Sequence, residues 1–150
     1  MWQRLLEELQ IWSERRPRAF RPIKIILGSP ATNQFPKLLY AHWAAISGNQ
    51  LFHTACLLML DAKPDGTTPD GESAANSPVW HARKIVGISL TNLHQGCLNN
   101  AIQPLWIAGK LFTHHEELRV RRAGHQVQNR WQSLRCPISG AGAIVVTLKD

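Results

Sequence analysis

Seven histidines are the residues of this 150-residue chain that could most readily bind a metal ion. His114 and His115 are adjacent, so their side chains point in different directions on a helix. His42 and His53 share a helical face but are eleven residues apart. These spacings favour helix-capping and core positions over coordination, and we expect no metal-ligating residues.

The three cysteines, Cys56, Cys97 and Cys136, are 41 and 39 residues apart. An odd number without a close pair argues against a disulfide framework and provides no zinc half-site. Cys56 lies in an apolar segment and is expected to be a small core residue. The N-terminal residues, MWQRLLEELQ, lack the apolar core of a signal peptide, so we expect an intracellular, reducing compartment.

Sequence signatures of the common enzyme classes are absent. There is no Gly-x-Ser-x-Gly motif and no phosphate-binding loop. The glycines Gly140 and Gly142 precede an apolar run, whereas a dinucleotide-binding fingerprint follows a strand and opens a helix. Most carboxylates lie in the first expected helix or in the loop over 63–77, a poor setting for paired acid–base catalysis. We therefore expect no catalytic residues, no cofactor-binding residues and no enzyme activity.

The formal net charge is +7, and arginines concentrate in 15–24 and 119–135. Such an excess permits contact with nucleic acid or with acidic proteins but specifies neither. Neither region is patterned as a rigid element that would hold side chains at base edges. The sequence therefore predicts no specific DNA binding, only weak, salt-sensitive attraction to phosphates.

The residues between Lys37 and Asp61 form a stretch of 23 residues without a charged side chain. This length could span a membrane, but His42, Asn49 and His53 fall on one helical face inside it. A helix that is apolar nearly all round with a narrow polar stripe is typical of the centre of a soluble helical domain. We expect that helix over 36–62, beginning at Pro36, and no membrane association.

The same 3.6-residue spacing of apolar residues predicts further helices over 2–14, 78–95, 98–112 and, more weakly, 115–131. Ser77 and Pro78 are typical of a helix start, and Gly96 is expected to terminate the helix over 78–95. The buried face of that helix is expected to contain Val79, Ala82, Val86, Leu90 and Leu93.

The expected connections are an extended segment over 16–35, in which 23–27 could form a short strand, and a loop over 63–77. The predicted fold class is all-α: an irregular domain of about five helices that forms part of a larger helical domain.

Four blocks of residues, in order, resemble the C-terminal part of the fungal-specific regulatory domain of binuclear zinc-cluster transcription factors. The resemblance covers about residues 1–118. The first block consists of Trp2, Leu5, Leu9 and Trp12 with Arg16, Pro17, Phe20 and Pro22. The second begins with Phe35 and Pro36, continues with Ala45, Asn49, Gln50, His53, Thr54, Ala55, Leu57 and Leu58, and ends at Lys63 and Pro64. The third consists of Trp80, His81, Ala82 and Arg83 with Ile85, Gly87 and Ile88, and the fourth covers residues 102–109.

Two features depart from the family. Its DNA-reading unit holds two zinc ions with six cysteines, which three cysteines about forty residues apart cannot provide. Zinc is therefore expected only in a missing N-terminal module, and no cofactor in this chain. Residues 119–150 also depart from the family's usual ending, and we expect a diverged, poorly ordered tail there, either native or an artefact of the gene model.

The resemblance implies a regulatory, protein-interaction part of a fungal transcription factor, located in the nucleus. Its partners would be proteins of the transcription machinery or a missing N-terminal half of the domain. Trp80 would anchor the helix over 78–95, Arg83 would pair with a helix carbonyl or a carboxylate, and His53 would be a hydrogen-bonded core histidine. The residues singled out as architectural or pocket-lining are His42, Asn49, His53, Trp80, His81, Arg83 and Trp106.

Two alternatives remain open from the sequence. One is a free-standing helical binding protein with a small-molecule pocket lined by His42, His53 and Trp106. The other is a non-functional product of a shortened reading frame.

Overall fold

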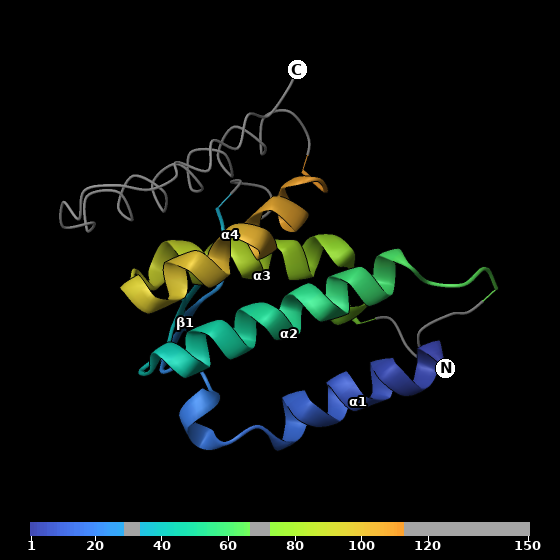
Figure 1. Ribbon diagram of the computed structural model, residues 1–150, viewed down its shortest axis with the longest axis horizontal. Coiled ribbons are helices and arrows are strands. Elements are labelled where there is room, and N and C mark those ends of the chain that lie inside the picture. Colours follow the sequence, from blue (N-terminus) through green and yellow to red (C-terminus); the bar gives the residue numbers. More distant parts are fainter. Residues whose placement is uncertain (29–33, 67–72, 113–150) are drawn as a thin grey trace, which may run out of the picture.

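The computed structural model describes residues 1–28, 34–66 and 73–112. Within these ranges it has four α-helices and one antiparallel pair of strands, which confirms the predicted all-α fold class. Helices α2, α3 and α4 contact one another pairwise, and α1 lies along α2 (Figure 1). The expected helix over 115–131 and the tail over 119–150 lie outside the described residues, as do residues 67–72 of the expected loop.

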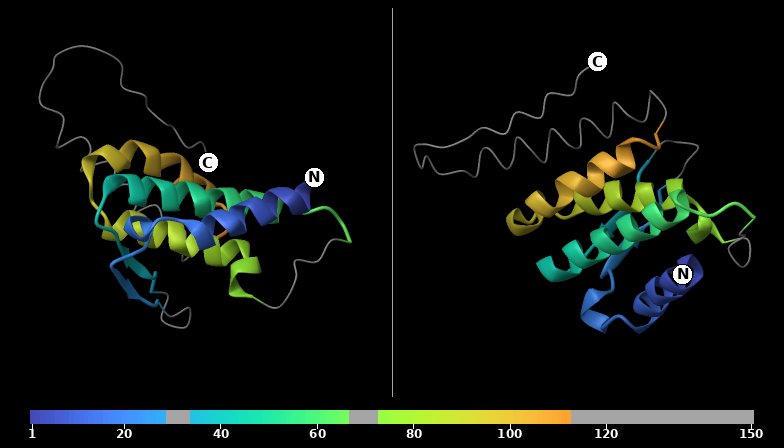
Figure 2. Two further views of the ribbon diagram at one scale, coloured as in Figure 1. Left: turned by 90° about the horizontal axis from the view of Figure 1, so that it is seen from below. Right: turned by 45° about the vertical axis from the view of Figure 1, so that its right-hand side comes forward.

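Helix α1 (Trp2–Arg15) matches the predicted helix over 2–14, and it ends just before Pro17, which disfavours helical angles in the preceding residue. The indole Nε1 of Trp2 donates a hydrogen bond of 2.6 Å to the carbonyl oxygen of Met59 in the last turn of α2. Trp12, near the other end of α1, stacks on Phe52 with ring centroids 5.1 Å apart. The two helices therefore run antiparallel, and α1 packs on the outer side of α2 (Figure 2).

A short hairpin replaces the beginning of the predicted second helix. Strand β1 (Lys24–Ile26) pairs antiparallel with β2 (Lys37–Leu39), with Ile25 opposite Leu38. The expectation that the helix begins at Pro36 is therefore wrong, because the backbone groups of 37–39 hydrogen-bond to β1 instead. Burial alternates along 37–40, as in a strand with one covered face.

Helix α2 extends over Trp43–Asp61 and is preceded by the 3₁₀-helix η1 (Arg18–Phe20) and the hairpin. His42 is the residue before its first turn and is exposed. The predicted stripe of His42, Asn49 and His53 on one helical face is therefore wrong at His42, whereas Asn49 and His53 are buried on α2.

Helix α3 (Pro78–Thr91) begins where Ser77 and Pro78 predicted, after the 3₁₀-helix η2 (Ala74–Asn76), and the Ser77 hydroxyl accepts a bond from the Trp80 amide. It ends at Thr91, not at 95. Asn92 caps it, because its side-chain amide donates to the Ile88 carbonyl at 2.9 Å. Gly96 is not the terminator; it lies in the first turn of the next helix.

The buried face of α3 differs from the predicted one. Ala82 and Val86 are fully buried as expected, but Val79, Leu90 and Leu93 are exposed. The fully buried apolar residues also include Ile85 and Ile88, which the predicted face did not contain. The difference arises because α3 is covered by α2, α4 and β2 together, so its buried arc follows those neighbours and not a single apolar stripe.

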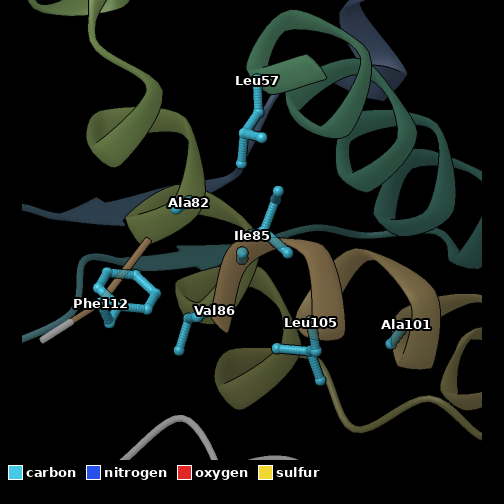
Figure 3. Packing of buried hydrophobic residues seen from close by; sticks show 8 residues of the cluster. Leu57, Ala82, Ile85, Val86, Ala101, Leu105 and Phe112 are labelled. Atoms are coloured by element: carbon cyan, nitrogen blue, oxygen red, sulfur yellow. The ribbon is translucent and has the colours of Figure 1, made fainter. Parts of the chain in front are cut away.

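Helix α4 (Gln95–Gly109) corresponds to the predicted helix over 98–112 and continues through Pro104. It closes the main core, which Figure 3 shows between α2, α3 and α4. That core contains Leu57, Ala82, Ile85, Val86, Ala101, Leu105, Ala108 and Phe112. A second buried cluster joins the hairpin to α2, α3 and α4 through Leu38, Tyr40, Ala45, Ile46, Ile88 and Cys97.

The helices within the described ranges are all too short or too polar to cross a bilayer.

Candidate functional site

A pair of buried histidines joins α2 to α3. His53 is 5% exposed and His81 is 3% exposed, and their Nδ1 atoms are 2.9 Å apart. The Nε2 atom of His81 lies 2.8 Å from the Ala75 carbonyl oxygen, just before α3. The pair therefore connects three segments, namely α2, α3 and η2.

The hydrogen-bond partners determine which nitrogen atoms carry protons. A carbonyl oxygen only accepts, so Nε2 of His81 carries the proton and its Nδ1 is an acceptor. Nδ1 of His53 must then donate to Nδ1 of His81. In this arrangement both imidazole rings are neutral.

Burial is the main reason that the pKa of His53 lies well below its ordinary value, and the neighbouring charges of His81, Lys84 and Arg16 lower it further. Burial also lowers the pKa of His81, with Lys84 acting in the same direction and the hydrogen bond to the Ala75 carbonyl opposing it. The neutral pair is thus the stable form, and its hydrogen bonds link α2 to α3 and to η2.

Aromatic rings surround the histidine pair. Trp80 lies edge-on to both imidazoles, with centroid distances of 5.7 Å to His53 and 4.9 Å to His81. Phe52 lies edge-on to His53 at 5.1 Å and stacks on Trp12 of α1. These contacts extend the cluster from α3 across α2 to α1.

Asn49 connects α2 to the segment that follows α1. Its Oδ1 accepts a 2.7 Å hydrogen bond from Nη1 of Arg16, and its Nδ2 donates to the carbonyl oxygens of Phe20 and Ala45 at 2.9 and 2.7 Å. Asn49 has no exposed surface. A buried amide that uses three of its hydrogen-bonding positions fixes the path of the chain around it.

Arg83 fastens α3 to the segment before β2. Its Nη2 donates a 2.6 Å bond to the carbonyl oxygen of Gln34, and its guanidinium lies 5.2 Å from the centroid of the Phe35 ring. This carbonyl belongs to the segment leading into β2, whereas the resemblance implied a helix carbonyl or a carboxylate.

The three residues of the alternative small-molecule pocket have different surroundings. His53 is buried against His81, whereas His42 is exposed ahead of α2. Trp106 of α4 is 52% exposed and has the Lys110 ammonium 3.7 Å from its ring centroid. None of the three lines the groove described below.

Asn92 is a structural residue that sequence reasoning missed. Its Oδ1 accepts from the Tyr40 amide at 2.9 Å, and its Nδ2 donates to the Leu38 carbonyl at 2.6 Å. An asparagine at a helix end is a recognisable capping signal. Its link to the hairpin, however, joins residues more than fifty positions apart and has no local signal.

An open groove lies between the end of β1 and the first turns of α3. Its volume is about 370 Å³. We call it the α3 groove; its lining consists of Leu27, Gly28, Pro36, Ala74, Ser77, Val79, Trp80, Arg83 and Lys84. Most of this lining is apolar, and its cations are Arg83 and Lys84.

Within the described ranges, no three histidine, cysteine or acidic side chains are placed to hold a metal ion together. The described part of the chain is thus a small helical domain with hydrogen-bonded polar residues in its interior and an apolar groove on its surface.

Comparison with curated proteins finds a similar sequence in a fungal transcription factor. The chain is 23% identical to "Transcription activator AMTR1" of Alternaria alternata over 138 residues, which cover 79% of this chain. The aligned part is 18% of that relative's own length. No protein-family model matches the chain, and no solved structure matches it.

Proposed function

We propose that this chain is the regulatory, protein-interaction part of a fungal transcription regulator that acts in the nucleus. The observation that carries this proposal is the similarity to the Alternaria alternata transcription activator over most of the chain. A relative of that kind points to a non-enzymatic regulator.

The residues of the family resemblance support an architectural role within such a module. Asn49 and Arg16, from two of the four blocks, are hydrogen-bonded to each other. His53 and His81, again from two blocks, form the buried pair. Residues that hold helices together are expected in a module that presents a surface to other proteins.

The proposed partners are proteins of the transcription machinery or an N-terminal half of the same domain. Zinc would belong to a DNA-binding module outside this chain, supplied by another segment or by a partner. The basic segment over 16–24 supports this division, since it forms η1 and the start of β1 and makes no extended helix for a major groove.

The test is a reporter assay in a fungal cell. The chain is fused to a bacterial repressor's DNA-binding domain and directed to a reporter promoter. We expect the fusion to change reporter output relative to the DNA-binding domain alone, and the Leu57→Ala variant to reduce the effect by destabilising the core. An intact, folded fusion with no effect on the reporter would contradict the proposal.

A separate measurement tests the division of DNA binding. We expect the purified chain to select no motif from a pool of random duplexes at about physiological salt, where weak phosphate attraction is largely lost. Enrichment of a defined sequence would show that the chain reads DNA by itself.

A further inference from the structure

We propose that the α3 groove binds an acidic–apolar peptide segment of a partner protein, with Lys84 pairing with a carboxylate of that segment. This inference rests on the proposed function, because it names the surface through which a protein-interaction module would act.

The groove provides apolar surface that the described chain leaves uncovered. Leu27 is 79% exposed and Val79 is 41% exposed, and they contribute to the lining from β1 and α3 respectively. Trp80 supplies a half-buried aromatic ring. Large apolar side chains of a ligand would gain free energy by covering these surfaces.

Strand β1, beside the groove, is not covered by the helix that covers its partner strand β2. Ile25 and Leu38 are directly paired and so face the same side of the sheet. Leu38 is 4% exposed, whereas Ile25 is 51% exposed. Helix α3 thus covers β2 but not β1, and Ile23, just before β1, is also 66% exposed. This apolar surface leads toward Leu27 and the groove.

The charge of the groove selects an anionic ligand. Lys84 is half-buried, its ammonium lies 4.9 Å from the centroid of the Trp80 ring, and burial lowers its pKa. Within the described ranges the ion pairs include only Arg4 with Glu8 on α1, so Lys84 has no carboxylate partner there. Among the described residues that line the groove, none is acidic. A partly desolvated cation without a counter-charge favours a bound carboxylate.

The size of the groove fits a short peptide segment. A volume of about 370 Å³ holds one or two apolar side chains together with the neighbouring carboxylate. The matching ligand is therefore a segment in which leucine-like residues lie next to aspartate or glutamate.

The experiment is a fluorescence-anisotropy titration of the full chain with labelled peptides. The probe is a short peptide of alternating aspartate and leucine. One comparison peptide replaces aspartate by lysine, and a second replaces leucine by serine. We expect the aspartate–leucine peptide to bind, with affinity falling as salt rises, and both comparison peptides to bind at least about tenfold more weakly.

Variants of the two stacked lysines test the position of the site. Lys84→Glu should weaken binding of the aspartate–leucine peptide by about tenfold or more, and Lys84→Met, which keeps an apolar side chain on Trp80, should weaken it as well. Lys110→Glu is the matched control, because Lys110 also lies over a tryptophan, Trp106 on α4, outside the groove. It should leave the affinity within about twofold of the unchanged chain. Circular dichroism melts verify that all three variants are folded.

The proposal is overturned if the aspartate–leucine peptide does not bind, if the lysine–leucine peptide binds equally well, or if Lys110→Glu weakens binding as much as Lys84→Glu. An active reporter fusion without peptide binding would overturn the groove and leave the proposed function standing. Peptide binding at the groove with an inactive reporter fusion would overturn the proposed function and leave the groove standing.

Discussion

The interior around α2 and the outer strand β1 depart from the usual distribution of side chains in opposite ways. The interior buries the polar residues Asn49, His53 and His81, whereas β1 exposes the apolar residues Ile25 and Ile26. Each of the three polar residues has a hydrogen-bond partner inside the fold. On β1 the apolar residues lie beyond the reach of the helices that cover β2.

A buried polar side chain and an exposed apolar side chain are both in unfavourable surroundings, but the two have different consequences. Burying a polar group costs little free energy when its hydrogen bonds are replaced, and it then fixes one arrangement of the helices. Exposing an apolar strand provides no such internal compensation, so a surface of this kind is typical of a contact site. The buried polar contacts therefore fix one arrangement of the helices, and the outer strand is available for binding.

The largest effect is expected from a buried leucine next to an exposed one on α2. Leu57 is 2% exposed and Leu58 is 47% exposed. Leu57→Ala should lower the free energy of unfolding by about 2–5 kcal/mol, because it leaves a cavity in the core. Leu58→Ala should lower it by less than about 1 kcal/mol. Urea unfolding measures both, and equal losses would mean that the core does not lie between α2, α3 and α4.

The next effect concerns a glycine at which α3 touches the hairpin. A Cβ atom on Gly87 would clash with the carbonyl oxygen of Pro36, so Gly87→Ala should destabilise the fold by about 1–3 kcal/mol. Gly96→Ala in α4 is the control, since its nearest neighbours are atoms of the His94 side chain at 3.4 Å. It should change stability by less than about 1 kcal/mol. A stabilised Gly87→Ala would show that α3 does not pack closely on the segment before β2.

A buried polar contact between α2 and the segment after α1 should contribute nearly as much to stability. Asn49→Ala leaves Arg16 and the Phe20 carbonyl without a partner and should cost about 1–3 kcal/mol in unfolding free energy. Asn100→Ala is the control, because its amide makes one long hydrogen bond of 3.4 Å to Ser47. That change should stay within about 0.5 kcal/mol. Similar losses of unfolding free energy in the two variants would show that the buried hydrogen bonds of Asn49 contribute no more than the long hydrogen bond of Asn100.

The histidine pair makes the interface between α2 and α3 sensitive to acid. The folded-state pKa values of His53 and His81 lie below the ordinary value of 6.5, so the unfolded chain takes up protons first as pH falls. Stability should be fully present above about pH 6.5 and should decrease as pH falls below it. Thermal melts across this range measure the slope.

Two substitutions distinguish the pair from other titrating groups. The double variant His53→Gln with His81→Gln should flatten the acid dependence, whereas His42→Gln, at an exposed position, should leave it unchanged. An unchanged slope in the double variant would contradict the neutral, buried pair.

The smallest effect on stability is expected on β1. Ile25→Thr should change the free energy of unfolding by less than about 0.5 kcal/mol, because Ile25 is half-exposed and threonine keeps the branched side chain of a strand. We expect the exposed apolar surface of β1 to bind a hydrophobic dye, and Ile25→Thr should reduce that binding. Ile88→Thr, at a fully buried position, should instead destabilise strongly. Dye binding that does not respond to Ile25→Thr would show that the exposed apolar surface lies elsewhere.

Local chemistry in the sequence determined most of the helices. Pro17 ends α1, and Ser77 with Pro78 begins α3, because capping and the fixed backbone of proline act within a few residues. The apolar spacing likewise indicated the all-α class and the long central helix. Polar residues inside that helix also pointed to its interior role, although the sequence treats Leu57 and Leu58 alike.

Only the tertiary structure decided how distant segments meet. Residues 37–39 join a strand because β1 is available to pair with them, and His42 consequently lies outside the helix. The bond between His53 and His81 depends on the packing of α3 against α2, and the elements described around Lys84 bring no carboxylate to pair with it. Such contacts join residues far apart in the chain, and their free energy exists only when both partners are in place, so no local pattern encodes them.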